Sequence, residues 1–182
     1  MAILILGLAL WVLPHLFKRI APDARASLGD RGKGLVTIAL VAGLILMIIG
    51  YRMAAFVPVW NPPSFAIHIN NLLMLVAVFI FGSAHTTGRL RGWTRHPMLL
   101  SVQVWAVAHL LVNGDLASLL LFGTLLAWAL ATPILINKAE PDWTRPELGD
   151  AKKDVVLVVI TLVAFAAFTG IHSLLGVWPF PS

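Results

Sequence analysis

The stretch "TRHPMLLSVQVWAVAHLLVNGDLASLLLFG", residues 94–123, decides the fold class of this chain. Its two apolar runs begin at Met98 and Leu116, contain no Asp, Glu, Lys or Arg, and are separated by Asn113-Gly114-Asp115. Long runs of this composition are typical of helices that cross a bilayer. Asn and Gly favour a tight turn, and Asp115 is suited to cap the following helix. The stretch therefore predicts two membrane helices joined by a short turn.

The composition of the whole chain indicates the same class. It is 59% hydrophobic and only 12% charged, with a mean hydropathy of +0.91, whereas soluble domains are roughly half apolar. We therefore expect an all-α integral membrane protein, a bundle of about six transmembrane helices in a single domain over residues 1–182. The expected spans are Ala2–Phe17, Leu35–Val57, Ala66–Ala84, Met98–Val112, Leu116–Ile136 and Val155–Val177.

The basic residues predict how these helices are oriented. Of the 13 Lys and Arg residues, all but Arg52 fall in the first, third and fifth connections between the spans. By the positive-inside rule these connections face the cytoplasm, and both termini lie on the outer side. This placement accounts for the net charge of +5, so we expect the lipid bilayer and not nucleic acid as partner.

The residue types that the chain lacks limit the kinds of metal site and covalent chemistry it can support, and its small residues bear on its oligomeric state. The chain has no cysteine, which excludes disulfides, thiolate ligands and cysteine nucleophiles. The expected spans contain no Asp or Glu, so a zinc site is less favoured than a site that needs imidazoles alone. Small residues such as Gly43 and Gly50 leave a homodimer open as an alternative to a monomer.

Two of the six histidines form a pattern that suggests a cofactor. His109 shares a helix face with Met98 and Trp105, and His172 follows Phe168 by one helical turn. Both histidines lie about four residues from the outer end of their spans, hence at similar depth. Two level imidazoles with aromatic neighbours on separate helices are the arrangement that binds a b-type haem. Ordinary core packing would explain the aromatic residues equally well.

Several stretches resemble the NnrU family of bacterial membrane proteins. They are "RGKGLVTIALVAGLILMIIGY" (31–51), "TRHPMLLSVQVWAVAHLLVNGDLASLLLFGTLLAWAL" (94–130) and "HSLLGVWPFP" (172–181). The resemblance implies a location in the bacterial inner membrane, with periplasmic termini, and an association with nitrite and nitric oxide metabolism in denitrification. The family is related to zeta-carotene isomerase, which isomerises a double bond using a haem b with two histidine ligands.

The isomerase motif can be placed on this chain residue by residue. Its pattern falls on Arg95, His96, Pro97, Trp105, Ala108 and His109. The resemblance thus implies that His109 is one iron ligand and that His15, in "PHLFKR", is the other. The isomerase has a cysteine three residues before the ligand histidine, where this chain has Ala106, so a ligand-switching step that recruits cysteine is excluded in this chain. His15 from the resemblance and His172 from depth are both candidates for the second ligand.

The leading function is therefore a haem-binding membrane protein of nitrogen-oxide or related redox metabolism. Two other classes remain open: a non-catalytic assembly or regulatory partner of a respiratory complex, and an enzyme that modifies isoprenoids or lipids. "RHP" also opens a cofactor-lining helix in isoprenylcysteine-type methyltransferases, but the polar residues that bind S-adenosylmethionine there have no clear match here. We interpret Arg95-His96-Pro97 as structural, because proline fits the first turn of a helix.

Overall fold

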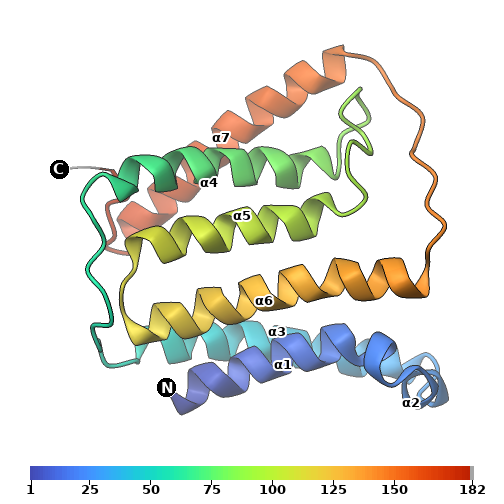
Figure 1. The fold of residues 1–182 in the computed structure, drawn as a ribbon, viewed down its shortest axis with the longest axis horizontal. Helices are drawn as coiled ribbons and strands as arrows, with labels where there is room; N and C mark the ends of the chain where they lie inside the picture. Colours follow the sequence, from blue (N-terminus) through green and yellow to red (C-terminus); the bar gives the residue numbers. More distant parts are fainter. Residues whose placement is uncertain (181–182) are drawn as a thin grey trace. The chain divides into compact units, whose positions relative to one another are not determined.

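The computed structural model describes residues 1–180, which form seven α-helices and no β-strand (Figure 1). This confirms the predicted all-α class. The helices are α1 (Ala2–Ile20), α2 (Pro22–Ser27), α3 (Arg31–Arg52), α4 (Ala66–Ser83), α5 (Pro97–Val112), α6 (Leu116–Ala139) and α7 (Lys152–Leu174).

Each of the six predicted spans corresponds to one of these helices. Five helices are long and apolar enough to cross a membrane, and α5 is a shorter apolar helix of 16 residues. α5 begins at Pro97, as the helix-start interpretation of Arg95-His96-Pro97 predicted. The short helix α2 was not predicted. It starts with Pro22 at its first position and has Asp23 in its first turn, both of which favour a helix start.

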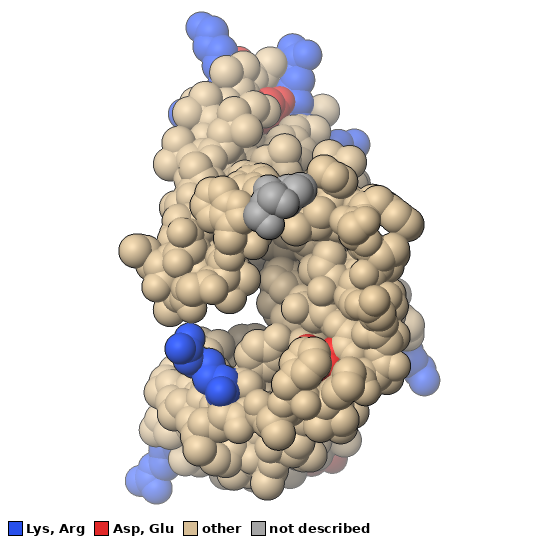
Figure 2. Space-filling view, turned by 90° about the vertical axis from the view of Figure 1, so that its left-hand side faces the viewer, with Lys and Arg blue, Asp and Glu red and all other residues tan. Residues whose placement is uncertain are grey.

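The surface of the helices is apolar, as a bilayer requires. Large hydrophobic side chains are exposed along α7, where Val155 and Val163 are each 65% exposed, and on α3, where Ile38 is 67% exposed. Figure 2 looks onto the helix ends on the left of Figure 1, and most of the surface there is neither acidic nor basic. Water would penalise so much exposed hydrocarbon, whereas lipid tails do not. The chain is a multi-pass membrane protein.

The helices group into two compact units. Unit 1 consists of Met1–Asn61 and Asn113–Pro141 and contains α1, α2, α3 and α6. Unit 2 consists of Pro62–Val112 and the described part of Asp142–Ser182 and contains α4, α5 and α7.

In unit 1, glycines bring the backbones of α1 and α3 into contact. A Cβ atom added at Gly7 would lie 2.6 Å from the backbone nitrogen of Met47, and one at Gly50 would overlap the backbone of Leu4. A Cβ at Gly43 would lie 3.0 Å from the carbonyl oxygen of Gly7. Without a hydrophobic effect to drive association in lipid, such close backbone approach is a main source of helix packing.

This packing corrects the sequence-based assignment of Gly43 and Gly50. The sequence suggested that these two glycines form the surface of a homodimer. In the structure both are buried, and α1 of the same chain covers them. They therefore offer no surface to a second copy, and that part of the prediction is wrong.

The turn before α6 is fixed by a buried carboxylate, also in unit 1. Asp115 is the N-cap of α6, and its side chain accepts a hydrogen bond from the backbone N–H of Ser118 over 3.1 Å. The Ser118 hydroxyl also donates to this carboxylate, so Tyr51 must donate its own hydroxyl proton to Ser118, over 2.8 Å. The predicted capping role of Asp115 is confirmed, and the cap also holds α3 through Tyr51.

In unit 2, α4 contacts both α5 and α7 (Figure 1). The Ser101 hydroxyl of α5 donates to the carbonyl oxygen of Ala77 on α4 over 2.8 Å. At the start of α7, the Asp154 carboxylate accepts from the backbone N–H groups of Arg89 and Leu90, over 3.1 and 3.2 Å. These bonds anchor the segment between α4 and α5 to α7.

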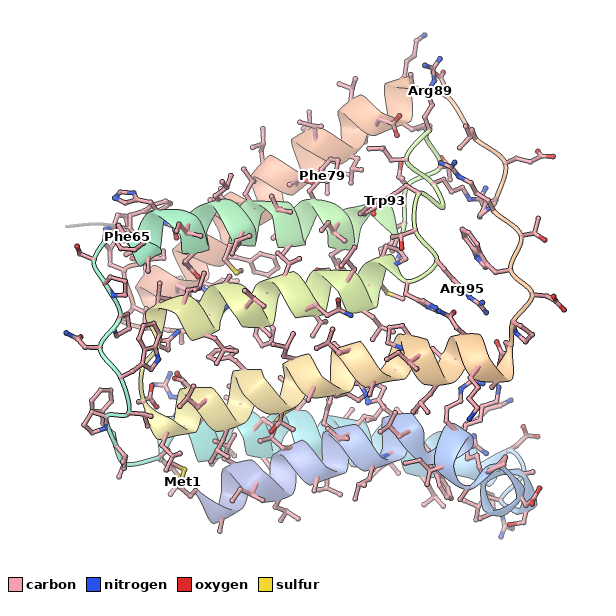
Figure 3. The ribbon with its side chains drawn as sticks, viewed as in Figure 1. Met1, Phe65, Phe79, Arg89, Trp93 and Arg95 are labelled. Carbon is pink, nitrogen blue, oxygen red and sulfur yellow. The ribbon has the colours of Figure 1, made fainter. Side chains whose placement is uncertain are left out.

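Within each unit the Lys and Arg residues gather at one end, except for Arg52 at the end of α3 in unit 1. In unit 1, Arg19 near the end of α1 forms an ion pair of 2.9 Å with Glu140, which follows α6. In unit 2, Figure 3 shows Arg89 and Arg95 at the end of the unit opposite Phe65, which precedes α4. A one-sided distribution within each unit is what the positive-inside rule requires of helices that cross the same membrane.

Candidate functional site

The three histidines that the sequence predicts as haem ligands share one local geometry. The Nδ1 atoms of His15, His109 and His172 each lie within 2.7–3.0 Å of the carbonyl oxygen four residues earlier. Because a carbonyl oxygen only accepts, Nδ1 carries the proton and donates it. In a neutral ring the lone pair then lies on Nε2. Metal-binding histidines are held in this tautomer by the same kind of Nδ1 hydrogen bond.

In each case the carbonyl belongs to an aromatic residue. Trp105 precedes His109 by one turn, with ring centroids 5.1 Å apart, and Phe168 precedes His172 by one turn. The spacing aromatic-x-x-x-His is visible in the sequence, and the helix makes its two members neighbours. The ring of Trp105 lies beside the imidazole of His109, and the ring of Trp11 beside that of His15, which restricts the rotation of these two imidazoles.

His15 lies in unit 1, in a cluster of three rings. Its centroid is 4.6 Å from that of Trp11 on the same helix and 4.8 Å from that of Trp128 on α6. Trp128 is 7% exposed, and among residues 1–180 neither indole N–H of this pair has a hydrogen-bond partner. Buried donors without an acceptor are costly in free energy, and this pair could not be recognised from the sequence. The cluster is thus aromatic and partly buried, and it contains two indole N–H groups that have no acceptor in the described structure.

Unit 2 contains an elongated groove of about 630 Å³. We call it the α4–α5–α7 groove, since α4 contacts both other helices, whereas α5 and α7 of the described chain do not pack closely together. Its volume lies in the range of ordinary ligand sites, roughly 300–1,000 Å³. The lining side chains include Ala77, Phe81, His85, Ser101, Trp105, Lys153, Thr161, Phe168 and His172.

The groove follows α7 over most of its length. From Lys153 to His172, a single face of α7 lines it at intervals of three or four residues. Nineteen residues of helix rise about 28 Å, close to the thickness of the hydrocarbon core. The walls are mainly apolar, with His85 and Lys153 toward one end, His172 toward the other, and Ser101 and Thr161 between them.

Helix register places His109 and His172 level with each other on either side of α4. Ser101 is bonded to Ala77, so His109, about two turns further along α5, is level with Asn70 on antiparallel α4. On the other side of α4, Gly82 faces Leu157 and Thr161 of α7. Counting residues along the two helices from this contact puts His172 nearly level with Asn70 as well. This agrees with the similar depth expected from the sequence.

The other predicted site residues are distributed differently. Trp105 lines the groove. Met98 is 50% exposed at the start of α5, about 16 Å along the helix from His109, so the two are not brought together. His15 belongs to unit 1 and His109 to unit 2. No group of three or more His, Cys, Asp or Glu side chains able to hold a metal ion occurs in residues 1–180.

Two polar residues of unit 2 were missed by sequence reasoning. Asn70, 8% exposed, has a side-chain carbonyl oxygen without a partner, and Thr161, 4% exposed, has a hydroxyl without a partner in the described structure. Thr161 lines the groove. The sequence does not show whether an Asn or Thr in an apolar helix has a hydrogen-bond partner, because that depends on the neighbouring helices.

Comparison with known proteins places the chain in a family. No curated protein and no solved structure matches it significantly. The NnrU protein family matches residues 3–179, which is nearly the whole chain and includes every histidine discussed above. The resemblance of the three sequence stretches is thereby confirmed, and the chain belongs to the NnrU protein family.

Proposed function

We propose that this NnrU-family protein binds haem b in unit 2, with His109 and His172 as the axial imidazoles. The observation that carries the proposal is the shared geometry of these two rings. Both donate Nδ1–H to a helix carbonyl, which orients Nε2 for metal binding, and register puts them at a similar level of unit 2, where Trp105 and His172 line the groove. The chain would serve redox metabolism of nitrite, nitric oxide or related compounds.

The residues of unit 2 meet the main requirements of a haem. A porphyrin brings four nitrogen ligands of its own and asks the protein for imidazoles and an apolar slot. Trp105 and Phe168 supply aromatic walls one turn below the two histidines. When bound between two imidazoles, the haem supplies one-electron exchange and leaves no open iron position for a substrate.

His15 is the alternative second ligand, favoured by the likeness to zeta-carotene isomerase. Its Nδ1 donates to the Trp11 carbonyl, so its tautomer is equally suitable. The two arrangements predict different variant phenotypes, because only one of His15 and His172 would share the role of His109.

An absorption spectrum of the purified protein, produced with ample haem supply, tests the proposal. We expect a Soret band and sharp α and β bands after reduction, with about one haem per chain. Two axial imidazoles give a low-spin iron, which electron paramagnetic resonance distinguishes from a high-spin one. A colourless and folded preparation would contradict haem binding and favour the non-catalytic partner of a respiratory complex.

The enzyme alternative requires a different result. S-adenosylmethionine binding that disappears in His96→Ala would support a lipid-modifying methyltransferase, since His96 precedes the first turn of α5. Double-bond isomerisation of an isoprenoid would support an isomerase. Haem content unchanged by His96→Ala is the outcome expected from its structural position.

The proposed location is the bacterial inner membrane, with both termini in the periplasm. The support is the one-sided distribution of Lys and Arg, with Arg52 alone on the outer side. Alkaline phosphatase fused after Ser182 should be active, and the same enzyme inserted within residues 141–150 should be inactive. A fluorescent protein that folds only in the cytoplasm should give the opposite pattern at the two sites. An active phosphatase within 141–150 would reverse the assignment.

A further inference from the structure

The α4–α5–α7 groove has a positive charge at one end. Lys153 lines the groove in the first turn of α7, and Thr86 and Thr87 line it at the same end. The Lys153 side chain is exposed, and its ammonium group forms no ion pair within residues 1–180. None of the described residues that line the groove is acidic. This end of the groove therefore favours a ligand with a negatively charged group.

The carboxylate that follows Lys153 in the sequence is already engaged elsewhere. Asp154 accepts hydrogen bonds from the backbone N–H groups of Arg89 and Leu90, and it does not line the groove. Arg89 is exposed at the same end of unit 2, where Figure 3 labels it. The charge of Lys153 is therefore available to a ligand.

Beyond this end the groove presents mainly hydrocarbon. Ser101 and Thr161 belong to its lining, but the Ser101 hydroxyl donates to the Ala77 carbonyl, and the Thr161 hydroxyl is buried out of reach of a ligand. The remaining lining side chains of this part are apolar and include Val78, Val102, Val156, Ile160 and Ala164. The charged group of the ligand is therefore expected to continue into an apolar chain.

The length of this part of the groove matches one leaflet of a bilayer. From Lys153 to Ala164, α7 rises about 16 Å, close to half of the hydrocarbon core of about 30 Å. His172 lies about 12 Å further along the helix. A lipid chain that begins beside Lys153 thus ends near Ala164, before it reaches the proposed haem ligand.

We infer that the Lys153 end of the groove binds an anionic phospholipid. The headgroup phosphate pairs with the Lys153 ammonium and accepts from the hydroxyls of Thr86 and Thr87, while one acyl chain lies along Ile160 and Ala164. The second chain stays in the surrounding bilayer. Anionic lipids are the ligands that basic side chains at a membrane surface attract. The inference goes beyond the proposed haem site and does not depend on it.

Native mass spectrometry tests the inference, on protein released from nanodiscs that contain equal amounts of phosphatidylglycerol and phosphatidylcholine. The wild type should retain about one phosphatidylglycerol per chain in preference to phosphatidylcholine. Lys153→Gln should lower the ratio of the two retained lipids about fivefold, the usual contribution of one basic side chain to binding an anionic lipid.

Lys152→Gln is the matched control. It removes the same charge from the neighbouring residue, which is exposed but does not line the groove, so the ratio should stay at the wild-type value. Equal losses in the two lysine variants would mean that the basic end attracts anionic lipid without a site. Equal retention of the two lipids by the wild type would also overturn the inference.

A second pair of variants tests the place of the acyl chain. Ile160 and Leu162 of α7 are 57% and 54% exposed, but of these two only Ile160 lines the groove. Ile160→Trp should obstruct the chain and lower the retention of phosphatidylglycerol, whereas Leu162→Trp should not. Equal retention in these two variants would place the lipid outside the groove and refute the site.

The absorption spectrum of the same samples separates this inference from the haem proposal. A preparation without haem that retains phosphatidylglycerol in a Lys153-dependent manner would refute the haem proposal alone. A preparation with haem and with no effect of Lys153→Gln would refute the lipid site alone.

Discussion

Gly50→Ala is expected to destabilise unit 1 by about 3 kcal/mol, at the upper end of the range for overpacked sites. The new Cβ atom would overlap the backbone of Leu4 and Ile3 on α1, and backbone atoms cannot rotate away as a side chain can. Either α1 separates from α3 or the helices bend, and both responses lose close contacts over the rest of the pair. Unfolding in mixed micelles of increasing SDS content measures the change.

Gly123→Ala provides the control for this prediction. Gly123 lies within α6 of the same unit, and a Cβ atom there meets nothing within 4 Å. It should leave the unfolding curve unchanged or shift it slightly toward stability, since alanine is the better helix former. Equal curves for the two variants would mean that close backbone contact between α1 and α3 does not stabilise the protein.

The glycines illustrate what the sequence could and could not predict about the fold. Apolar runs of about 20 residues located the spanning helices, and the chemistry of Pro97 and Asp115 located two helix starts. Gly43 and Gly50 indicated a close helix contact, but a small-residue pattern does not name its partner. α2 was missed because a six-residue helix in a polar connection has no apolar periodicity to reveal it.

The candidate site likewise combines features that could be predicted from the sequence with features that only the structure shows. The spacing of Trp105 to His109 and of Phe168 to His172 could be seen in the sequence, because one helix turn creates each pair. Asn70 and Thr161 could not be selected, since what distinguishes them is a missing partner on a neighbouring helix. These two polar groups are thus distinguished by tertiary packing alone, whereas the proposed haem ligands follow from local periodicity.

His109→Ala is expected to remove most of the bound haem, or to convert the remainder from low to high spin. Losing one of two axial imidazoles opens a coordination position on the iron and weakens retention of the group. The bundle should still insert, because alanine is compatible with an apolar helix. Haem stoichiometry, the position of the Soret band and the electron paramagnetic resonance spectrum measure the effect.

His172→Ala, His15→Ala and His68→Ala complete the comparison. If His172 is the second ligand, its variant should reproduce the His109→Ala spectrum and His15→Ala should keep the wild-type one. If His15 is the second ligand, as the likeness to the isomerase implies, His15→Ala should reproduce the His109→Ala spectrum and His172→Ala should keep the wild-type one. His68 is exposed near the start of α4, so its variant should retain full haem content.

Rescue by free imidazole separates ligation from structural support. In His109→Gly, the missing side chain leaves room for imidazole to bind the iron, so millimolar imidazole should restore the low-spin spectrum. A purely structural histidine, which holds the Trp105 carbonyl over 3.0 Å, would show no such recovery, because free imidazole cannot replace a tethered hydrogen bond within the helix. A wild-type spectrum in His109→Ala would place any haem elsewhere and make this histidine an ordinary polar group of α5 that bonds to its own helix.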